Sequence, residues 1–526
     1  MSSARFIPLM LLAFVLAAFL AQFGIDFNAD NVAAATIVTA SSLAMLLYLL
    51  WTPAIQTHPL STFAIFGFCV TTQMGALLVQ SATATSLVHH LRQPVATFAT
   101  LALYQGVALV AHWLYRVFYR SPDMSRQPAP LFRSMLRALR LYTPPTVGAL
   151  WIMGFLGLGS LLLGSGEGVI SKVLQGISFL AWSPFLIPMF VAQVGPSYCN
   201  PRRHYLLLSL FAGALALFAL AVNARGLMLS GLATVGLFAL LRAMRSDKPV
   251  TLMQVGKVAV IGLLLGAISI PAADLVTAMV IARKDRGRVS ALKMVENTLD
   301  IVQRPQLLQQ QRALDRFVSL RDGYDEVYFA SPLIGRLIET KFHDNALYFG
   351  SRLSERDERR VFDITGEFLW ATLPEPWLKA LDVNIDKKDL SFSMGDYIAF
   401  LGSAGGVGSF RTGSGLAQGL AIFGPGYFLV FFLFCPVLFL TVDVLAYRGK
   451  DGVVLISALG MLGIWKMFQY GISAESMQYL IQAVLRGLPQ NLLLYLLVFH
   501  LASLIDRGLR GFVSPAPRRL LPSELA

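Results

Sequence analysis

Residues 427–442 read YFLVFFLFCPVLFLTV, an apolar stretch without a single charged side chain. The apolar character extends over about residues 418–446. A helix needs about 20 mostly apolar residues to cross the hydrocarbon core of a bilayer. The stretch therefore predicts a membrane-spanning helix.

Stretches of this kind recur along the chain, and twelve of them are long enough to cross a membrane. They lie at about residues 6–24, 32–51, 60–80, 95–115, 146–165, 170–194, 204–222, 226–244, 252–280, 418–446, 453–471 and 478–504. The first is expected to be a retained helix, because only Arg5 precedes it and no convincing small-residue cleavage site follows. The sequence thus predicts an all-α polytopic membrane protein.

The overall composition supports this class. Hydrophobic residues make up 56% of the 526 residues and charged residues 14%, against about 45–50% and about 25% in soluble domains. This excludes a disordered chain, a disulfide-rich secreted scaffold and an ordinary cytosolic enzyme. The three cysteines offer neither a disulfide framework nor a zinc spacing. The net charge of +13 is attributed to basic loops at a membrane and not to nucleic-acid binding.

Basic residues cluster in alternate loops of the twelve-span arrangement, and all of these loops fall on one side. They are Arg116, Arg120, Arg126, Arg133, Arg137 and Arg140; Arg202 and Arg203; Arg242, Arg245 and Lys248; Arg448 and Lys450; and Arg507, Arg510, Arg518 and Arg519. Lys and Arg are enriched in cytoplasmic loops. The pattern therefore places both termini in the cytoplasm.

One connection is far longer than the others. Residues 283–417 contain 19 Lys and Arg against 19 Asp and Glu, a balanced polar composition that does not suit a lipid environment. The expected organisation is a membrane domain over 1–282, a large loop domain outside the cytoplasm over 283–417, a second membrane domain over 418–505, and a basic cytoplasmic tail over 506–526.

The loop domain is expected to be mainly helical. Apolar residues recur three or four positions apart from Val289 to Leu320, with a break at Pro305. Pro332, Pro374 and Pro376 divide further helical pieces. The glycine-rich end, residues 402–415, indicates a loop whose backbone approaches another group closely.

Three cations fall in or beside the outer halves of predicted spans. Arg225 lies in the tight turn between spans seven and eight, Lys466 inside span eleven and Arg486 inside span twelve. A charged group at such a depth suggests function, and together they favour a cavity for a polyanion such as a lipid diphosphate. The alternatives are a snorkelling Arg225, and pairing of Lys466 and Arg486 with Glu475 or with backbone carbonyls.

His343, in the sequence KFHDN, is the first candidate for a general base, and the adjacent Asp344 is the second. The alternative is that His343 is an ordinary surface-loop residue. The sequence has no phosphate-binding Gly-x-x-x-x-Gly-Lys-Ser/Thr loop, no His-Glu-x-x-His and no carboxylate-rich metal cluster. We therefore expect no cofactor and no metal site.

Residues 370–379, 394–397, 410–419 and 423–426 read WATLPEPWLK, MGDY, FRTGSGLAQG and FGPG. These stretches resemble the bacterial O-antigen and exopolysaccharide repeat-unit polymerases, the Wzy-like family. The shared features are a proline- and tryptophan-containing stretch with a lysine, a Thr-Gly-rich stretch and a span with a Phe-Gly-rich start. The outward arginine at Arg225 and the large late loop resemble it too. The resemblance implies a GT-C-like fold in the bacterial inner membrane, with the large loop in the periplasm.

The resemblance also implies a reaction. A polyprenyl-diphosphate oligosaccharide at the periplasmic face would donate its glycan to the terminal sugar of another repeat unit, with inversion and without a metal. Fixed cations would have to stabilise the leaving diphosphate, and the candidates are Arg225, Arg411, Lys466 and Arg486. Arg336, Tyr348 and Arg352 are candidates for holding sugars. Membrane lipid, and chain-length regulator and flippase proteins, are the expected partners.

Three other functions are compatible with the sequence: an O-antigen ligase, a flippase or other transporter, and a scaffold in an envelope assembly complex. An O-antigen ligase would use the same donor, but its histidine usually lies close to the end of the large loop, whereas His343 lies about seventy residues before it. A flippase or other transporter of lipid-linked sugars would often show two similar halves. No inverted repeat is visible in the sequence, and its cations cluster toward one side.

Overall fold

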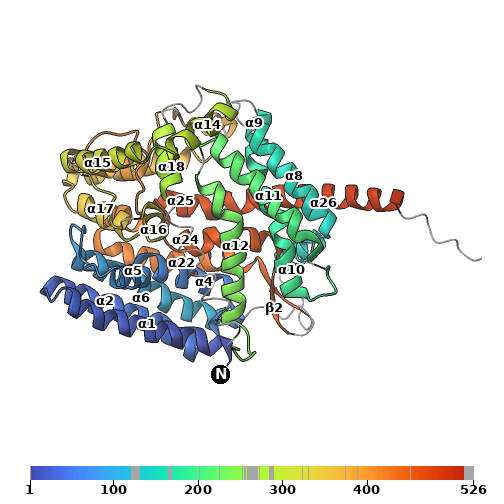
Figure 1. Ribbon diagram of the computed structural model, residues 1–526, viewed down its shortest axis with the longest axis horizontal. Coiled ribbons are helices and arrows are strands. Elements are labelled where there is room, and N and C mark those ends of the chain that lie inside the picture. Colours follow the sequence, from blue (N-terminus) through green and yellow to red (C-terminus); the bar gives the residue numbers. More distant parts are fainter. Residues whose placement is uncertain are drawn as a thin grey trace, which may run out of the picture.

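The structure is a computed structural model of the chain. It describes residues 2–119, 131–163, 169–200, 202–223, 225–251, 253, 256, 271, 273–283, 289–322, 324–329, 331–373, 375–387, 389–449 and 452–513. The described chain is mostly helical, as the sequence predicts, and Figure 1 shows its helices in order along the chain.

The N-terminal helices form one side of the molecule. They are α1 (Ser3–Ile25), α2 (Ala29–Trp51), α3 (Ala54–Thr57), α4 (Pro59–Cys69), the π-helical turn η1 (Val70–Met74), α5 (Gly75–Ala82) and α6 (Pro94–Phe118). The Asn28 side chain caps α2 by accepting from the Asp30 N–H at 3.1 Å. Pro59 and Pro94 are the first residues of their helices. An N–H at this position has no partner within the helix, so proline is tolerated there. Helices α1, α2 and α6 pack side by side (Figure 1).

A second group of helices follows. It comprises α7 (Leu131–Ala138), α8 (Val147–Leu163), α9 (Val169–Ile177), the 3-10 helix η2 (Ser178–Phe185), α10 (Leu186–Val194), α11 (Arg202–Ala221) and α12 (Arg225–Met244). The end of α12 returns to the start of the chain, because Ser3 N donates to Lys248 O at 2.9 Å. The start of α1, the end of α2 and the end of α12 therefore share one end of the bundle, called here the N-terminal end.

The long polar insert is helical. Its helices are α14 (Ala291–Val302), α15 (Pro305–Asp322), α16 (Pro332–Leu337), α17 (Thr340–Gly350), α18 (Glu355–Trp370), α19 (Glu375–Ala380) and α20 (Met394–Leu401). The predicted break at Pro305 is confirmed, since α14 ends and α15 begins there. A small core of its own includes Phe349, Val361 and Ile398. Figure 1 shows α15 and α17 at the opposite side of the molecule from the projecting end of α26.

The C-terminal part contains several interrupted helices. Its elements are α21 (Gly415–Phe423), the 3-10 turn η4 (Gly424–Gly426), α22 (Tyr427–Asp443), β1 (Ala446–Arg448), β2 (Val454–Ile456), α23 (Ala458–Leu462), α24 (Ile464–Tyr470), α25 (Met477–Gln482), the π-helical turn η5 (Ala483–Gly487) and α26 (Leu488–Val513). Strands β1 and β2 form a small antiparallel hairpin with Tyr447 opposite Leu455. The sequence predicts an all-α protein and does not predict this hairpin.

Eight helices of the described residues are long and apolar enough to cross a membrane. They are Ser3–Ile25, Ala29–Trp51, Pro59–Ala82, Pro94–Phe118, Ser171–Val194, Arg202–Ala221, Gly415–Asp443 and Met477–Arg510. Val147–Leu163, Ser230–Met244 and Ala273–Ala282 are shorter apolar helices at predicted spans. The structure thus supports a membrane protein, while most of the predicted span 252–280 lies outside the described residues.

The predicted span 453–471 is not one continuous helix. It consists of strand β2 followed by α23 and α24, which together run only from Ala458 to Tyr470. At 1.5 Å per residue such a helix is about 20 Å long, shorter than the roughly 30 Å hydrocarbon core. Its apolar composition reflects burial against neighbouring helices, since Ile464 and Phe468 are buried. The segment that follows, residues 471–476, is an irregular loop that is mostly buried, with Glu475 exposed.

Candidate functional site

Helix α17 is polar in sequence and yet buried. Lys341, His343, Asp344 and Asn345 are all at most 3% exposed. Polar and charged side chains are rarely so deeply buried unless each has a partner. The partners come from the membrane helices and from the loops that follow α20 and α24.

The start of α17 is hydrogen-bonded to the π-helical turn η1, which lies between α4 and α5. Thr71 O accepts from Glu339 N at 2.7 Å, and Thr72 O accepts from the Thr340 hydroxyl at 2.8 Å. Thr71 and Thr72 both belong to η1. A π-helical turn changes the usual i→i−4 bonding of a helix, and such turns are frequent at functional sites. Here its carbonyls fix the entry of α17 into the bundle.

His343 joins three segments that are distant in sequence. Its Nδ1 lies 2.8 Å from Ser414 Oγ, and its Nε2 lies 3.4 Å from Ser473 Oγ. Ser414 also caps α21 by accepting from Ala417 N, which leaves its hydroxyl proton for Nδ1. Burial lowers the pKa of His343 to about 4, so the imidazole is neutral near pH 7. The histidine is thus a buried bridge and not a surface-loop residue.

Asp344 serves a neighbouring helix. One carboxylate oxygen accepts from Arg92 N at 2.8 Å, and the other accepts from Gln93 N at 3.0 Å and Thr97 Oγ1 at 3.0 Å. These donors belong to the start of α6, where a carboxylate is favoured by the exposed N–H groups and the helix dipole. Lys341 Nζ lies 3.8 Å away. This is the arrangement of a helix-capping carboxylate.

A more open cluster lies beside His343. Gln469 Nε2 donates to Glu339 Oε1 at 2.9 Å and to Arg336 O at 3.1 Å. Arg336, whose side chain is 50% exposed, donates to Thr412 Oγ1 at 3.2 Å and acts electrostatically on both Glu339 and Glu475. Burial raises the pKa of Glu339 to about 8. Glu475 itself is exposed.

We call Arg336, Glu339, His343, Ser414, Ser473 and Glu475 the junction site, because they lie where the polar insert meets the membrane helices. The site combines an exposed cation, an exposed carboxylate and a buried histidine. Lys466 is exposed on α24, one helical turn before Gln469. Chemically, such a set can hold an anion and accept a proton from a hydroxyl.

The glycine-rich stretch is explained by a close backbone contact. A Cβ on Gly413 would lie 2.6 Å from Glu475 O and 2.9 Å from Gly395 N. A Cβ on Gly395 would lie 2.5 Å from Arg411 O. The two motifs MGDY and RTGSG therefore pack directly against each other and against the loop that carries Glu475, which confirms the predicted close approach of this loop.

The remaining predicted residues lie apart from the junction site. Arg411 stacks over Tyr324 at 4.3 Å and donates to Ala404 O at 2.9 Å. Arg486, in η5, donates to Thr372 O at 2.9 Å. The alternative of a backbone carbonyl partner is thus confirmed for Arg486.

Two of the three predicted sugar-binding residues, Tyr348 and Arg352, contact each other. Arg352 Nη1 donates to Tyr348 OH at 3.2 Å, and the Arg92 guanidinium lies 4.8 Å from the centre of the Tyr348 ring. This leaves an aromatic ring between two cations on the far end of α17. The side chain of Arg225 lies outside the described residues, although α12 begins there.

Sequence reasoning missed four residues of the site: Glu339, Ser414, Ser473 and Glu475. The sequence predicts Glu475 only as a pairing partner of Lys466 or Arg486. The available signal for Ser473 and Glu475 was the short polar segment between the predicted spans 453–471 and 478–504. Such irregular backbone at membrane depth is tolerated where it is buried in protein or lines a cavity.

Within the part of the chain that the structure describes, no group of three or more His, Cys, Asp or Glu side chains is placed to hold a metal ion. Fold and site define a polytopic helical membrane protein with a polar site at a junction of interrupted helices. Comparison with protein-family models, with curated proteins and with solved structures finds no match.

Proposed function

We propose that this protein is an inner-membrane glycosyltransferase that polymerises polyprenyl-diphosphate-linked oligosaccharide repeat units at the periplasmic face. The observation that carries the proposal is the junction site, in which an exposed arginine and an exposed glutamate lie near each other on segments that a buried histidine joins. The resemblance of the residues around it to repeat-unit polymerases supports the choice of substrate. The fold would be GT-C-like.

In the proposed reaction, a sugar hydroxyl of one repeat unit attacks the anomeric carbon of another. The new C–O bond forms as the bond to the diphosphate breaks, and the configuration inverts through an oxocarbenium-like transition state. The hydroxyl proton passes to the Glu475 carboxylate. The electron pair of the broken bond leaves on the diphosphate, whose negative charge Arg336 and Lys466 stabilise.

His343 has a positioning role in this proposal. Its two nitrogens contact Ser414 and Ser473, and it thereby holds the loop that contains Thr412 against the loop that contains Glu475. At 3% exposure it is too enclosed to contact a sugar directly in this arrangement. Asp344 supports the same helix from its other side by capping α6.

The test is deletion of the gene, followed by gel profiling of surface glycan and of lipid-linked intermediates. Complementation uses the wild type, Glu475→Gln and Arg336→Gln, with Glu355→Gln as a matched control on an exposed carboxyl of α18. Positioned acid–base groups contribute about 10²–10⁴-fold to rate. We expect the deletion to abolish long chains while single repeat units are still delivered. Glu355→Gln should restore the long chains, and Glu475→Gln should not.

Other profiles would point elsewhere. Long chains that accumulate on the polyprenyl carrier would indicate a ligase, and units trapped at the cytoplasmic face would indicate a flippase. Full complementation by Glu475→Gln would refute the assigned proton acceptor. An unchanged profile after deletion would refute the glycan assignment altogether.

A further inference from the structure

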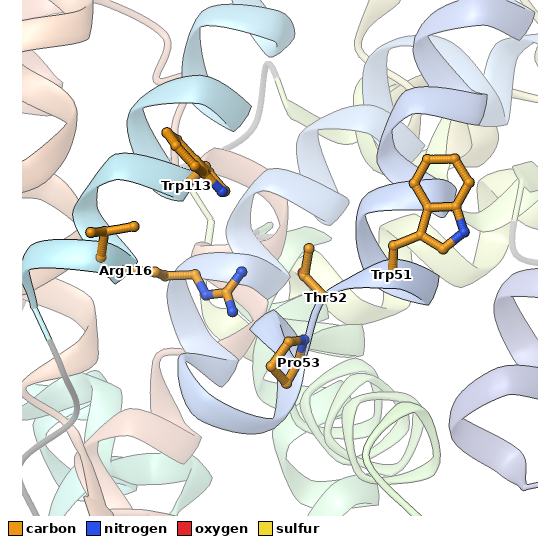
Figure 2. Close-up of a pocket in the computed structure, with 6 residues that line it drawn as sticks. Trp51, Thr52, Pro53, Trp113 and Arg116 are labelled. Atoms are coloured by element: carbon orange, nitrogen blue, oxygen red, sulfur yellow. The ribbon is translucent and has the colours of Figure 1, made fainter.

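A hollow lies at the N-terminal end of the bundle, away from the junction site. Its volume is about 200 Å³, and it is lined by Trp51, Thr52, Pro53, Trp113, Arg116 and Val117. Figure 2 shows the Arg116 side chain reaching from α6 toward Thr52 and Pro53 after the end of α2, with Trp113 above it on α6 and Trp51 beyond Thr52. The hollow thus lies between the ends of two membrane-spanning helices.

Arg116 brings a positive charge to this hollow. Within the described residues it has no carboxylate at ion-pair distance, and its Nε is buried without a hydrogen-bond partner. Its Nη1 donates to Tyr48 OH at 3.1 Å. A guanidinium has five donors, so most of them remain for a ligand.

A chain of hydrogen bonds holds the guanidinium in place. Tyr48 OH lies 2.7 Å from His112 Nδ1, His112 Nε2 lies 2.9 Å from Ser61 Oγ, and Ser61 Oγ donates to Asp443 Oδ2 at 2.7 Å. With Arg116 donating to Tyr48, every hydroxyl in this chain can donate onward toward Asp443. The cation is therefore fixed before any ligand arrives, which reduces the entropy lost on binding.

An exposed apolar face of α6 adjoins the hollow. Leu103, Val110, Trp113 and Val117 are exposed on α6 at helical spacing. Trp51, at the end of α2, is 78% exposed. Tryptophans are enriched at the level of the lipid headgroups, where the ring contacts hydrocarbon and its N–H reaches polar groups. The apolar stripe therefore leads from the hydrocarbon region to the cation at the headgroup level.

We propose that this hollow binds the headgroup phosphate of an anionic diacyl phospholipid in the adjacent leaflet. Arg116 donates to the phosphate oxygens, the indoles of Trp51 and Trp113 lie at the level of the headgroup, and the acyl chains lie along the exposed stripe of α6. The stripe distinguishes a lipid from free phosphate, which has no chains to place there. A zwitterionic headgroup would bring its own cation toward Arg116 and is disfavoured.

The experiment is native mass spectrometry of the detergent-purified full chain titrated with dioleoyl phosphatidylglycerol, and separately with dioleoyl phosphatidylcholine. The variants are Arg116→Gln and the matched control Arg242→Gln, an exposed arginine in the last turn of α12 at the same end of the bundle. Hydrogen bonds to charged groups are stronger than neutral ones. We therefore expect a loss of phosphatidylglycerol affinity of about tenfold or more in Arg116→Gln, and less than about twofold in the control.

Three results would overturn the proposal: equal affinity of the wild type for the two lipids, equal weakening by both arginine variants, or competition by millimolar inorganic phosphate as strong as that by the lipid. Arg116→Gln could perturb the Tyr48–Asp443 chain, so Trp51→Ala provides a second variant at an exposed position. It is expected to weaken phosphatidylglycerol binding several-fold with an unchanged melting temperature. Unaltered binding in Trp51→Ala would also count against the site.

Discussion

Glu339 makes the stability of this protein depend on pH in a direction that can be worked out from the structure. The side chain is 5% exposed, and burial raises its pKa from 4.5 to about 8. The folded protein therefore keeps this proton over a pH range in which the unfolded chain has already released it. Between these two pKa values, raising the pH favours the unfolded state.

The magnitude follows from the size of the shift. Each pKa unit corresponds to about 1.36 kcal/mol, so the carboxyl destabilises the fold by about 2 kcal/mol at pH 6 and by about 4–5 kcal/mol above pH 8. The wild type should lose about 2–3 kcal/mol of its free energy of unfolding between pH 6 and pH 9 through this group. Glu339→Gln keeps an oxygen acceptor for Gln469 Nε2 and cannot ionise, so it should lose none of this.

Thermal unfolding of the detergent-purified protein across pH 6–9 tests the prediction. Glu339→Gln should melt at a higher temperature than the wild type at pH 9, and the difference should shrink toward pH 6. Glu355→Gln, at an exposed carboxyl of α18, should follow the wild type. Parallel pH profiles for the wild type and Glu339→Gln would refute the assignment of a protonated, buried carboxyl.

Three further predictions concern residues around the junction site. Asp344→Asn places an amide against N–H donors at the start of α6 and should destabilise the fold by about 2–4 kcal/mol, measured by thermal unfolding at pH 7; a change below about 0.5 kcal/mol would contradict the capping role. Gly413→Ala brings a methyl within 2.6 Å of Glu475 O, and the forced backbone shift should cost about 1–3 kcal/mol and lower glycan chain length in the complementation assay, whereas Gly406→Ala, with open space around it, is the control. His343→Ala should impair glycan formation through loss of loop positioning, and His343→Asn should restore part of it; equal and complete loss in both would favour a direct proton-transfer role for the imidazole.

Local sequence patterns were sufficient for much of the fold. Apolar runs of about 20 residues predicted the membrane helices because burial in lipid is decided by composition over one segment. Pro305 marked the break between α14 and α15 because proline removes a helix hydrogen bond whatever its surroundings. The sequence also indicates His343 as a candidate site residue, although it does not indicate the two serines that contact it.

These local patterns do not predict where a helix is interrupted. The π-helical turn η1 and the short helices α23 and α24 lie inside stretches, residues 60–80 and 453–471, whose overall composition predicts unbroken spans. A backbone group that leaves the regular helix ladder must find another partner. For Thr71 that partner is Glu339, 268 positions away from Thr71. No window of local sequence contains such information.

Hydropathy and charge act residue by residue, so the amino-acid sequence alone predicts a helical membrane protein with one large polar insert. Which polar residues become a site depends on the tertiary structure. Arg411 is largely buried, donates to Ala404 O and lies 4.0 Å from Asp396, whereas Arg336, which lies 3.5 Å from Glu326, and Glu475 remain exposed near His343. A charged side chain costs free energy in a protein interior unless it is paired, and whether a partner is present depends on which distant segments the fold brings together.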